Sequence, residues 1–228
     1  MRVELHSPSD KAFEAVEHLG AVISEPQPGQ RHIGILFKLE NGPATVCDLA
    51  WHKIVRAEPP SPSDFWLQSS LDETNRRVVA SAVAGSVAVQ KPPISYSPLY
   101  NGMSFEAGTL KYEGNAAGEG LTCATFVLAI FESLGFPLLV RDTWQQRPSD
   151  LNWQESIVVR LEEWAQHHQI DIDDHLAAIR SAPKSMRYRP EEVAAGVADF
   201  DSPLDFAAAQ SIGGDIVRAM QQPPNAPP

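Results

Sequence analysis

The feature that most constrains this chain is a cysteine at the start of a strongly apolar helix. The stretch Gly118–Val127 reads Gly-Glu-Gly-Leu-Thr-Cys-Ala-Thr-Phe-Val, and large apolar residues continue at helical spacing to Leu134, where Gly135 and Pro137 end the pattern. The first turn of this buried helix carries Cys123. Unpaired backbone N–H groups and the positive end of the helix dipole favour the thiolate, the nucleophilic form of cysteine. Cys123 is therefore a candidate nucleophile, and a cysteine that only packs is the alternative.

A second segment predicts a β-hairpin that carries a histidine and a carboxylate. Arg31–Glu40 and Ala44–Trp51 have the β-branched and aromatic content of strands, and an Asn-Gly pair between them is a strong turn signal. Strand alternation places His32 on one face of the first strand, and Asp48 and His52 together on one face of the second. Such a pair can supply a general base and the residue that orients it. The alternative is that His32 is a structural residue at a strand edge whose ring is hydrogen-bonded to the backbone.

These two segments resemble the site motifs of papain-fold hydrolases of the NlpC type. His32-Ile33-Gly34-Ile35 with Val46-Cys47-Asp48-Leu49-Ala50 is similar to the histidine hairpin of that family, and Leu121–Val127 is similar to its nucleophile helix. The histidine precedes the cysteine here, as in the circularly permuted branch that includes the lecithin:retinol acyltransferase-like proteins. The resemblance covers roughly residues 30 to 135. It implies a permuted papain-like α+β fold, with an antiparallel sheet packed on the cysteine helix.

Carried over by position, the resemblance implies that Cys123 is the nucleophile, His32 the base and Asp48 the orienting residue. The permuted proteins usually carry histidine at the orienting position, and a carboxylate can hold an imidazolium at least as well. His52 lies on the same predicted face as Asp48 and stays open as the alternative partner. Tyr96 resembles a tyrosine upstream of the family's cysteine. Its hydroxyl would help to bind an oxyanion, and the alternative is a packed aromatic residue.

Composition bears on partners and compartment. The chain has 228 residues, a net charge of −11 and a pI near 5.0, which argues against nucleic acid or anionic lipid surfaces as partners. Cys47 and Cys123 offer no disulfide framework, and the N-terminus lacks the apolar region of a signal peptide, so we expect a cytoplasmic protein. No run is long enough to span a membrane. His167, His168 and the residues at 171–175 lack a recognisable ligand spacing, so we expect neither metal nor cofactor.

The rest of the chain predicts helices and breaks. We expect a helix over Ser9–Leu19, a polar linker over Glu25–Gln30, a brief strand at Phe65–Leu67 and a helix over Leu71–Val87. Further helices are predicted over Leu151–His168, Asp173–Arg180, Pro190–Phe200 and Pro203–Met220. The expected organisation is a catalytic domain over residues 1–140, a helical extension over 141–220 that packs on it, and a disordered tail over 221–228.

Together these features predict a cysteine peptidase or amidase. Cys123, His32 and Asp48 would cleave amide bonds in a small-molecule or peptide-like substrate. An acyltransferase or thioesterase of the same fold is one alternative, because the acceptor that meets the thioester decides between the reactions. A non-catalytic interaction scaffold is the other. The sequence does not indicate an oligomeric state.

Overall fold

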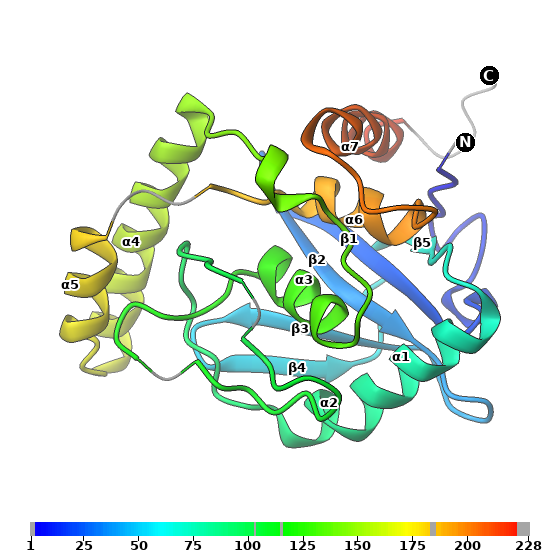
Figure 1. The fold of residues 1–228 in the computed structure, drawn as a ribbon, viewed down its shortest axis with the longest axis horizontal. Helices are drawn as coiled ribbons and strands as arrows, with labels where there is room; N and C mark the ends of the chain where they lie inside the picture. Colours follow the sequence, from blue (N-terminus) through cyan, green and yellow to red (C-terminus); the bar gives the residue numbers. More distant parts are fainter. Residues whose placement is uncertain (1–2, 103, 115, 183–185, 223–228) are drawn as a thin grey trace.

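The computed structural model describes residues 3–102, 104–114, 116–182 and 186–222 (Figure 1). Within these ranges the protein is an α+β structure around a five-stranded antiparallel sheet with the strand order β4-β3-β2-β1-β5. The strands are β1 (Leu19–Gln27), β2 (Gln30–Phe37), β3 (Thr45–Trp51), β4 (Ile54–Glu58) and β5 (Phe65–Gln68). The mixed α+β class predicted from the sequence is confirmed.

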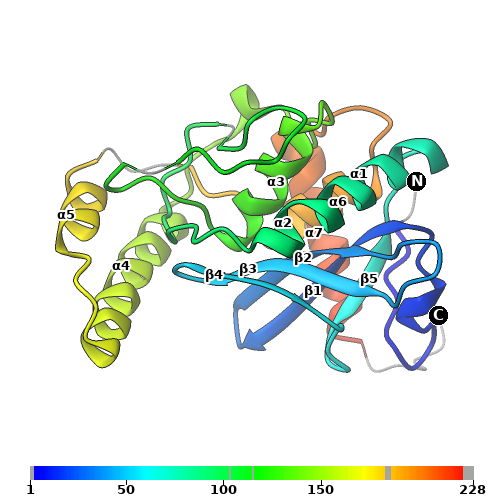
Figure 2. The same cartoon turned by 90° about the horizontal axis from the view of Figure 1, so that it is seen from below.

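Several helices cover one face of this sheet, and others lie beside it. They are α1 (Glu73–Gly85), α2 (Val87–Gln90), α3 (Cys123–Ser133), α4 (Pro148–His168), α5 (Asp173–Ser181), α6 (Pro190–Ala198) and α7 (Phe206–Met220). In Figure 2, α1, α2, α3 and α6 lie over one face of the sheet, while α4 and α5 stand together beside its end. Helix α7 packs against α6. Helix α3 itself packs against strands β2 and β3 and against α6.

Strand alternation divides the buried side chains between two clusters. The large cluster, on the face covered by α3, takes from the first three strands Leu19, Ala21, Ile23, Ile33, Ile35, Phe37, Cys47 and Leu49. The smaller cluster comprises Phe13, Val16, Val22, Leu36, Ala44, Val46 and Trp66. Both faces of the central strands are thus buried, which fixes their register firmly.

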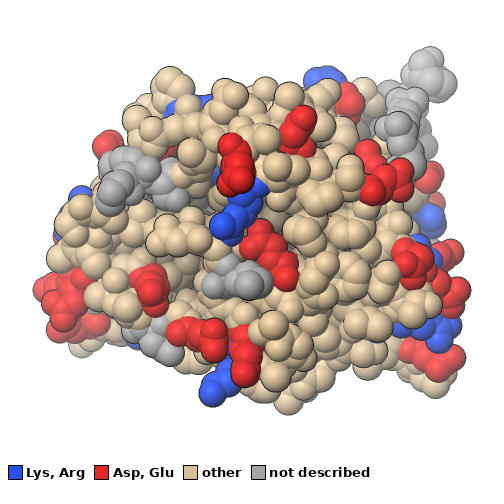
Figure 3. All heavy atoms as spheres, viewed as in Figure 1, with Lys and Arg blue, Asp and Glu red and all other residues tan. Residues whose placement is uncertain are grey.

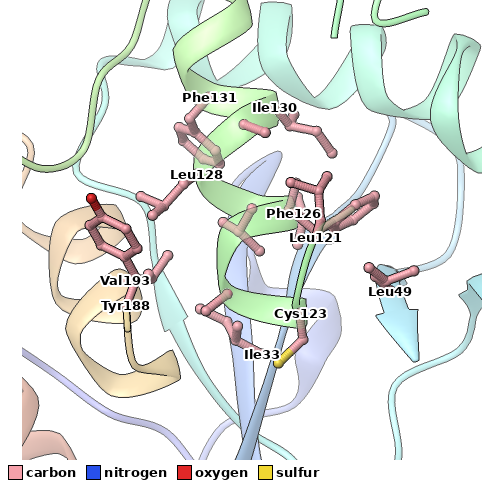
Figure 4. Packing of buried hydrophobic residues seen from close by; sticks show 14 of the residues in the cluster. Ile33, Leu49, Leu121, Cys123, Phe126, Leu128, Ile130, Phe131, Tyr188 and Val193 are labelled. Carbon is pink, nitrogen blue, oxygen red and sulfur yellow. The ribbon is translucent and has the colours of Figure 1, made fainter. Parts of the chain in front are cut away.

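A hydrogen-bonded cap determines where α3 begins. Oγ1 of Thr122 accepts a hydrogen bond from the Thr125 N–H at 3.2 Å, and Oγ1 of Thr125 accepts one from the Thr122 N–H at 2.7 Å. This reciprocal pair satisfies backbone donors that the first turn would otherwise leave unpaired. The helix therefore starts at Cys123, as the sequence predicts. Nearly all of its side chains are buried against the sheet and neighbouring helices (Figure 4).

The predicted helix over Ser9–Leu19 is wrong. Residues Phe13–Ala15 form a single 3-10 turn, and Leu19 already belongs to β1. The first half of β1 is buried on both faces, so its apolar residues run continuously and lack the alternation that indicates a strand. The predicted linker over Glu25–Gln30 holds the end of β1, a tight turn and the first residue of β2.

The histidine hairpin and the later helices agree with the prediction to within a few residues. The predicted helix over Leu71–Val87 is divided between α1 and α2 at Ser86. The brief strand predicted at Phe65–Leu67 is β5. The sequence does not predict β4. The division into domains near residue 140 stays a prediction, and most of the predicted tail lies outside the described residues.

A close approach of two chain segments brings Tyr96 to the start of α3. The Leu121 N–H donates to the Ser95 carbonyl at 3.0 Å, and the Ser97 N–H donates to the Leu121 carbonyl at 3.1 Å. A Cβ atom on Gly120 would clash with the Ser95 carbonyl oxygen. Only glycine at position 120 allows this pairing, which holds Tyr96 beside the cysteine helix.

We expect Gly120→Ala to lower the free energy of unfolding by about 1–3 kcal/mol, because rigid backbone would have to move. Gly85→Ala is the matched control, since no atom lies within 4 Å of the added Cβ at the end of α1. It should leave stability unchanged or raise it by up to about 1 kcal/mol. Urea denaturation measures both, and equal stability of the two variants would contradict the close approach.

Candidate active site

A buried carboxylate connects strands β2, β3 and β4 beside the predicted base, His32. Oδ2 of Asp48 in β3 lies 2.5 Å from Nε2 of His32 in β2, and its Oδ1 accepts a hydrogen bond from Nε of Arg56 in β4 at 3.0 Å. Arg56 also donates to Oδ2 through its terminal nitrogen. Burial acts to raise the pKa of Asp48, but the hydrogen bonds and charges of His32 and Arg56 lower it below its ordinary value. Asp48 is therefore a charged, fully paired group.

A glycine makes room for this carboxylate. A Cβ on Gly34 would lie 2.7 Å from Cγ1 of Val46 and 3.0 Å from Cβ of Asp48. A side chain at position 34 would therefore push β3 away and lengthen the contact between Asp48 and His32. The close approach of β3 therefore explains why the His32-Ile33-Gly34-Ile35 motif has glycine at position 34.

Cys123 also lies beside His32. The sulfur points from the first turn of α3 towards β2, beside Ile33 (Figure 4). It lies close enough to His32 and to the Ile33 N–H for both to act on the pKa of the thiol. Because Asp48 holds Nε2 of His32, Nδ1 is the ring nitrogen left to share a proton with the sulfur.

The pKa values of the two groups favour a thiolate beside an imidazolium. Burial acts to raise the pKa of Cys123, but the charge and hydrogen bond of His32, helped by the Ile33 N–H, lower it. Burial likewise acts to lower the pKa of His32, and the neighbouring Cys123 thiolate and Asp48 outweigh it and raise the pKa to about 10. Both shifts favour the ion pair over the neutral thiol and imidazole.

Tyr96 lies against the same cysteine. Its hydroxyl is close to both the sulfur and the backbone N–H of Cys123. Burial first, and the nearby Cys123 second, raise the pKa of Tyr96 well above its ordinary value, so the phenol keeps its proton. A protonated phenol beside the Cys123 N–H in the first turn of α3 places two hydrogen-bond donors at one point.

Two buried histidines hold the backbone of Tyr96. Nδ1 of His52 accepts a hydrogen bond from the Tyr96 N–H at 3.3 Å, and Nε2 of His175 in α5 donates to the Tyr96 carbonyl at 3.0 Å. Nδ1 of His175 accepts from the Gly118 N–H at 3.1 Å, which fixes its tautomer. Burial lowers the pKa of His52 to about 4 and lowers that of His175, so both rings are neutral near pH 7.

This arrangement separates the two candidate partners of His32. His52 lies in the turn after β3, with its ring against Tyr96 and His175, whereas Asp48 contacts His32 directly. The predicted common face of Asp48 and His52 is wrong at its end, because the β3–β4 pairing is irregular between Leu49 and Trp51. Asp48 is the residue in position to orient the imidazole.

A cavity of about 220 Å³ lies beside the cysteine. His32, Tyr96 and Cys123 all line it, while Asp48 stands behind His32. Its further walls come from Trp51, from Trp153, Ile157 and Arg160 of α4, and from Arg187 and Tyr188 before α6. Three of the four predicted site residues therefore share one cavity, and the fourth contacts one of the three.

Several residues at this site are absent from the sequence-based prediction. Arg56 is one, although its position opposite Asp48 in the β3–β4 ladder would follow from a predicted second hairpin. His175 and Arg187 are others, and they come from segments far along the chain that carry no spacing signal. Within the described ranges, no cluster of His, Cys, Asp and Glu side chains is arranged to hold a metal ion. In the same ranges, no helix has both the length and the apolar character needed to cross a bilayer.

We compared the chain with protein-family models, with curated proteins and with solved structures, and none of them matches it. The chemistry of the site therefore rests on its own geometry.

We expect iodoacetamide to label Cys123 and to leave Cys47 unlabelled, because burial raises the pKa of Cys47 to about 12. The midpoint of the pH–rate profile for Cys123 should lie below the ordinary thiol value of 9.0. His32→Ala should move that midpoint upwards, since burial then acts on the thiol without the imidazolium. Peptide mass spectrometry over a pH series measures both effects. Labelling of Cys47 alone, or of both sites equally, would contradict the assignment.

A second expectation concerns the residue that orients His32. Asp48→Asn should lower the pKa of the His32 ring from about 10 by at least roughly one unit, because the carboxylate no longer favours the imidazolium. His52→Asn should leave it unchanged, since the amide oxygen can still accept from the Tyr96 N–H. NMR titration of labelled histidine measures the two values, and thermal melting checks that both variants fold. A larger fall of the His32 pKa in His52→Asn than in Asp48→Asn would instead make His52 the partner.

Proposed function

We propose that this protein is a thiol-dependent hydrolase of amide bonds, a cysteine peptidase or amidase with a permuted papain-like arrangement. The observation that carries the proposal is the meeting of Cys123, His32 and Tyr96 at one cavity, with the Asp48 carboxylate behind the imidazole. Nucleophile, base, orienting group and oxyanion donors are the set that acyl transfer needs. The histidine hairpin of β2 and β3 precedes α3 in the chain, which is consistent with the permuted order.

In the first half-reaction the thiolate of Cys123 attacks the amide carbonyl carbon. A C–S bond forms, and the carbonyl π electrons move to the oxygen, where the Tyr96 hydroxyl and the Cys123 N–H donate hydrogen bonds. The oxyanion then collapses, the C–N bond breaks, and the departing amine takes the proton from Nδ1 of His32. A thioester and a neutral imidazole remain.

In the second half-reaction water attacks the thioester. His32 takes a proton from the water as the new C–O bond forms, and the C–S bond then breaks to release the carboxylic acid and restore the thiolate–imidazolium pair. Asp48 keeps the ring oriented through both steps and stabilises its charged form, and Arg56 in turn stabilises Asp48. An acceptor other than water would make the same site an acyltransferase, and a thioester substrate with water as the acceptor would make it a thioesterase.

We expect an activated ester such as p-nitrophenyl acetate to acylate wild-type protein at Cys123, seen as a burst of p-nitrophenol and as an added acetyl mass. Cys123→Ala should abolish the adduct. His32→Ala should slow its formation about a hundred-fold, because the thiolate partner is lost. Steady release after the burst indicates hydrolysis, whereas release that needs an added amine or alcohol indicates transfer.

Cys47→Ala is the matched control, since Cys47 is buried in the sheet away from the cavity and its loss should leave the burst unchanged. Thermal melting shows whether each variant is folded. Reactivity no faster than that of a small free thiol, unchanged by His32→Ala, would instead make this protein a non-catalytic interaction scaffold.

A further inference from the structure

The cavity beside Cys123 is cationic, although the protein as a whole is acidic. Its charged lining residues other than His32 are Arg31, Arg160 and Arg187, and among the described residues no Asp or Glu lines it. Elsewhere acidic side chains are more widespread than basic ones, as the face in Figure 3 shows, and the net charge is −11. A local excess of positive charge against that background needs an explanation.

One of the three arginines is already neutralised. Arg31 donates from Nε and Nη2 to the two carboxylate oxygens of Glu191, each at 2.8 Å. Such a two-point pair satisfies both partners and leaves little charge for a ligand. The unbalanced charge of the cavity therefore lies on Arg160 and Arg187.

Arg187 is held rigidly and is short of negative partners. Its carbonyl accepts hydrogen bonds from Nη2 of Arg147 at 2.9 Å and from the Trp144 indole at 3.1 Å, and its guanidinium lies 4.0 Å from the centre of the Trp153 ring. The carboxylate nearest to it is Asp150, whose Oδ1 lies 3.9 Å from Nη1.

That carboxylate is shared. Asp150 also accepts from Arg147 at 2.7 Å and from Arg189 at 3.0 Å. Among the described residues, Nε of Arg187 is buried without a hydrogen-bond partner. Burial, and then the like charge of Arg189, lower the pKa of Arg187 to about 10, which shows how poorly its charge is compensated.

Arg160 of α4 is the second uncompensated cation. Its Nη1 donates to the amide oxygen of Gln30, a neutral acceptor, and among the described residues it forms no ion pair. Within the described ranges, two guanidinium groups that keep donors without a partner thus line the cavity that holds the candidate nucleophile.

We propose that the acyl part of the substrate carries a carboxylate, which Arg187 and Arg160 bind while Cys123 attacks the carbonyl. Guanidinium groups match a planar carboxylate, and the paired charges offset the burial cost of each. The space of about 220 Å³ suits a short acyl chain rather than a lipid with two long tails. The claim that this anion is the substrate rests on the proposed hydrolase function. The claim that the cavity binds an anion rests only on the two arginines.

The test compares matched activated esters. Mono-p-nitrophenyl esters of the dicarboxylic acids from adipate to suberate carry the free carboxylate, and their methyl esters are neutral counterparts of the same length. We expect kcat/KM of wild-type protein to be at least about ten-fold higher for the charged ester in the best pair. Arg187→Met and Arg160→Met should each bring that ratio close to one. Arg180→Met is the matched control, because Arg180 pairs with Glu162 outside the cavity, and it should keep the ratio.

A binding measurement separates the two proposals. Cys123→Ala cannot form the thioester, so calorimetry with the free-acid monoamides of the same dicarboxylic acids measures anion binding without chemistry. Acylation of Cys123 with equal kcat/KM for charged and neutral esters would overturn the anion site and leave the hydrolase proposal standing. Arginine-dependent binding of the monoamides without any acylation of wild-type protein would support the anion site and overturn the hydrolase proposal.

Discussion

The site depends on how one buried negative charge is compensated. Asp48 is 2% exposed, and a carboxylate there without partners would be very costly. Arg56 alone could balance it, but the bond to His32 makes the imidazole a second cationic partner, and this favours a thiolate at Cys123 in turn. The state of the cysteine is therefore set two contacts away, by a strand pairing that places Arg56 opposite Asp48.

The C-terminal helices belong to the site as much as the sheet does. Helix α5 supplies His175, which holds the carbonyl of Tyr96 and, through Gly118, the loop that leads to α3. Helix α4 forms one wall of the cavity. Burial keeps the His52 and His175 rings neutral near neutral pH. The two neighbouring rings therefore do not repel one another, and both can hold the Tyr96 backbone. Tyr96, one of the two proposed oxyanion donors, is thus held from two distant parts of the chain.

How far the sequence predicts this structure depends on the range of the interactions involved. The capped apolar helix at Cys123 and the hairpin of His32 and Asp48 are local, with their turn, cap and alternation signals within a few residues. The alternation of apolar and polar residues does not reveal β1, because both faces of its first half are buried and its residues there are all apolar or small. Arg187 and His175 meet the site only through packing of segments more than fifty residues from Cys123, and no local pattern encodes such contacts.

The contrast between an acidic surface and a cationic cavity has a kinetic consequence. Outside the cavity, an anionic substrate that comes within a Debye length of the surface, about 8 Å at physiological salt, meets mainly the net charge of −11, which repels it. Inside the cavity, Arg187 and Arg160 act at short range and in a drier setting, where salt screens them less. Added salt should therefore speed the encounter more than it weakens the bound state. Such a site would select its anion by contact after arrival rather than by long-range attraction, which suits recognition of one small carboxylate and not of an extended acidic polymer.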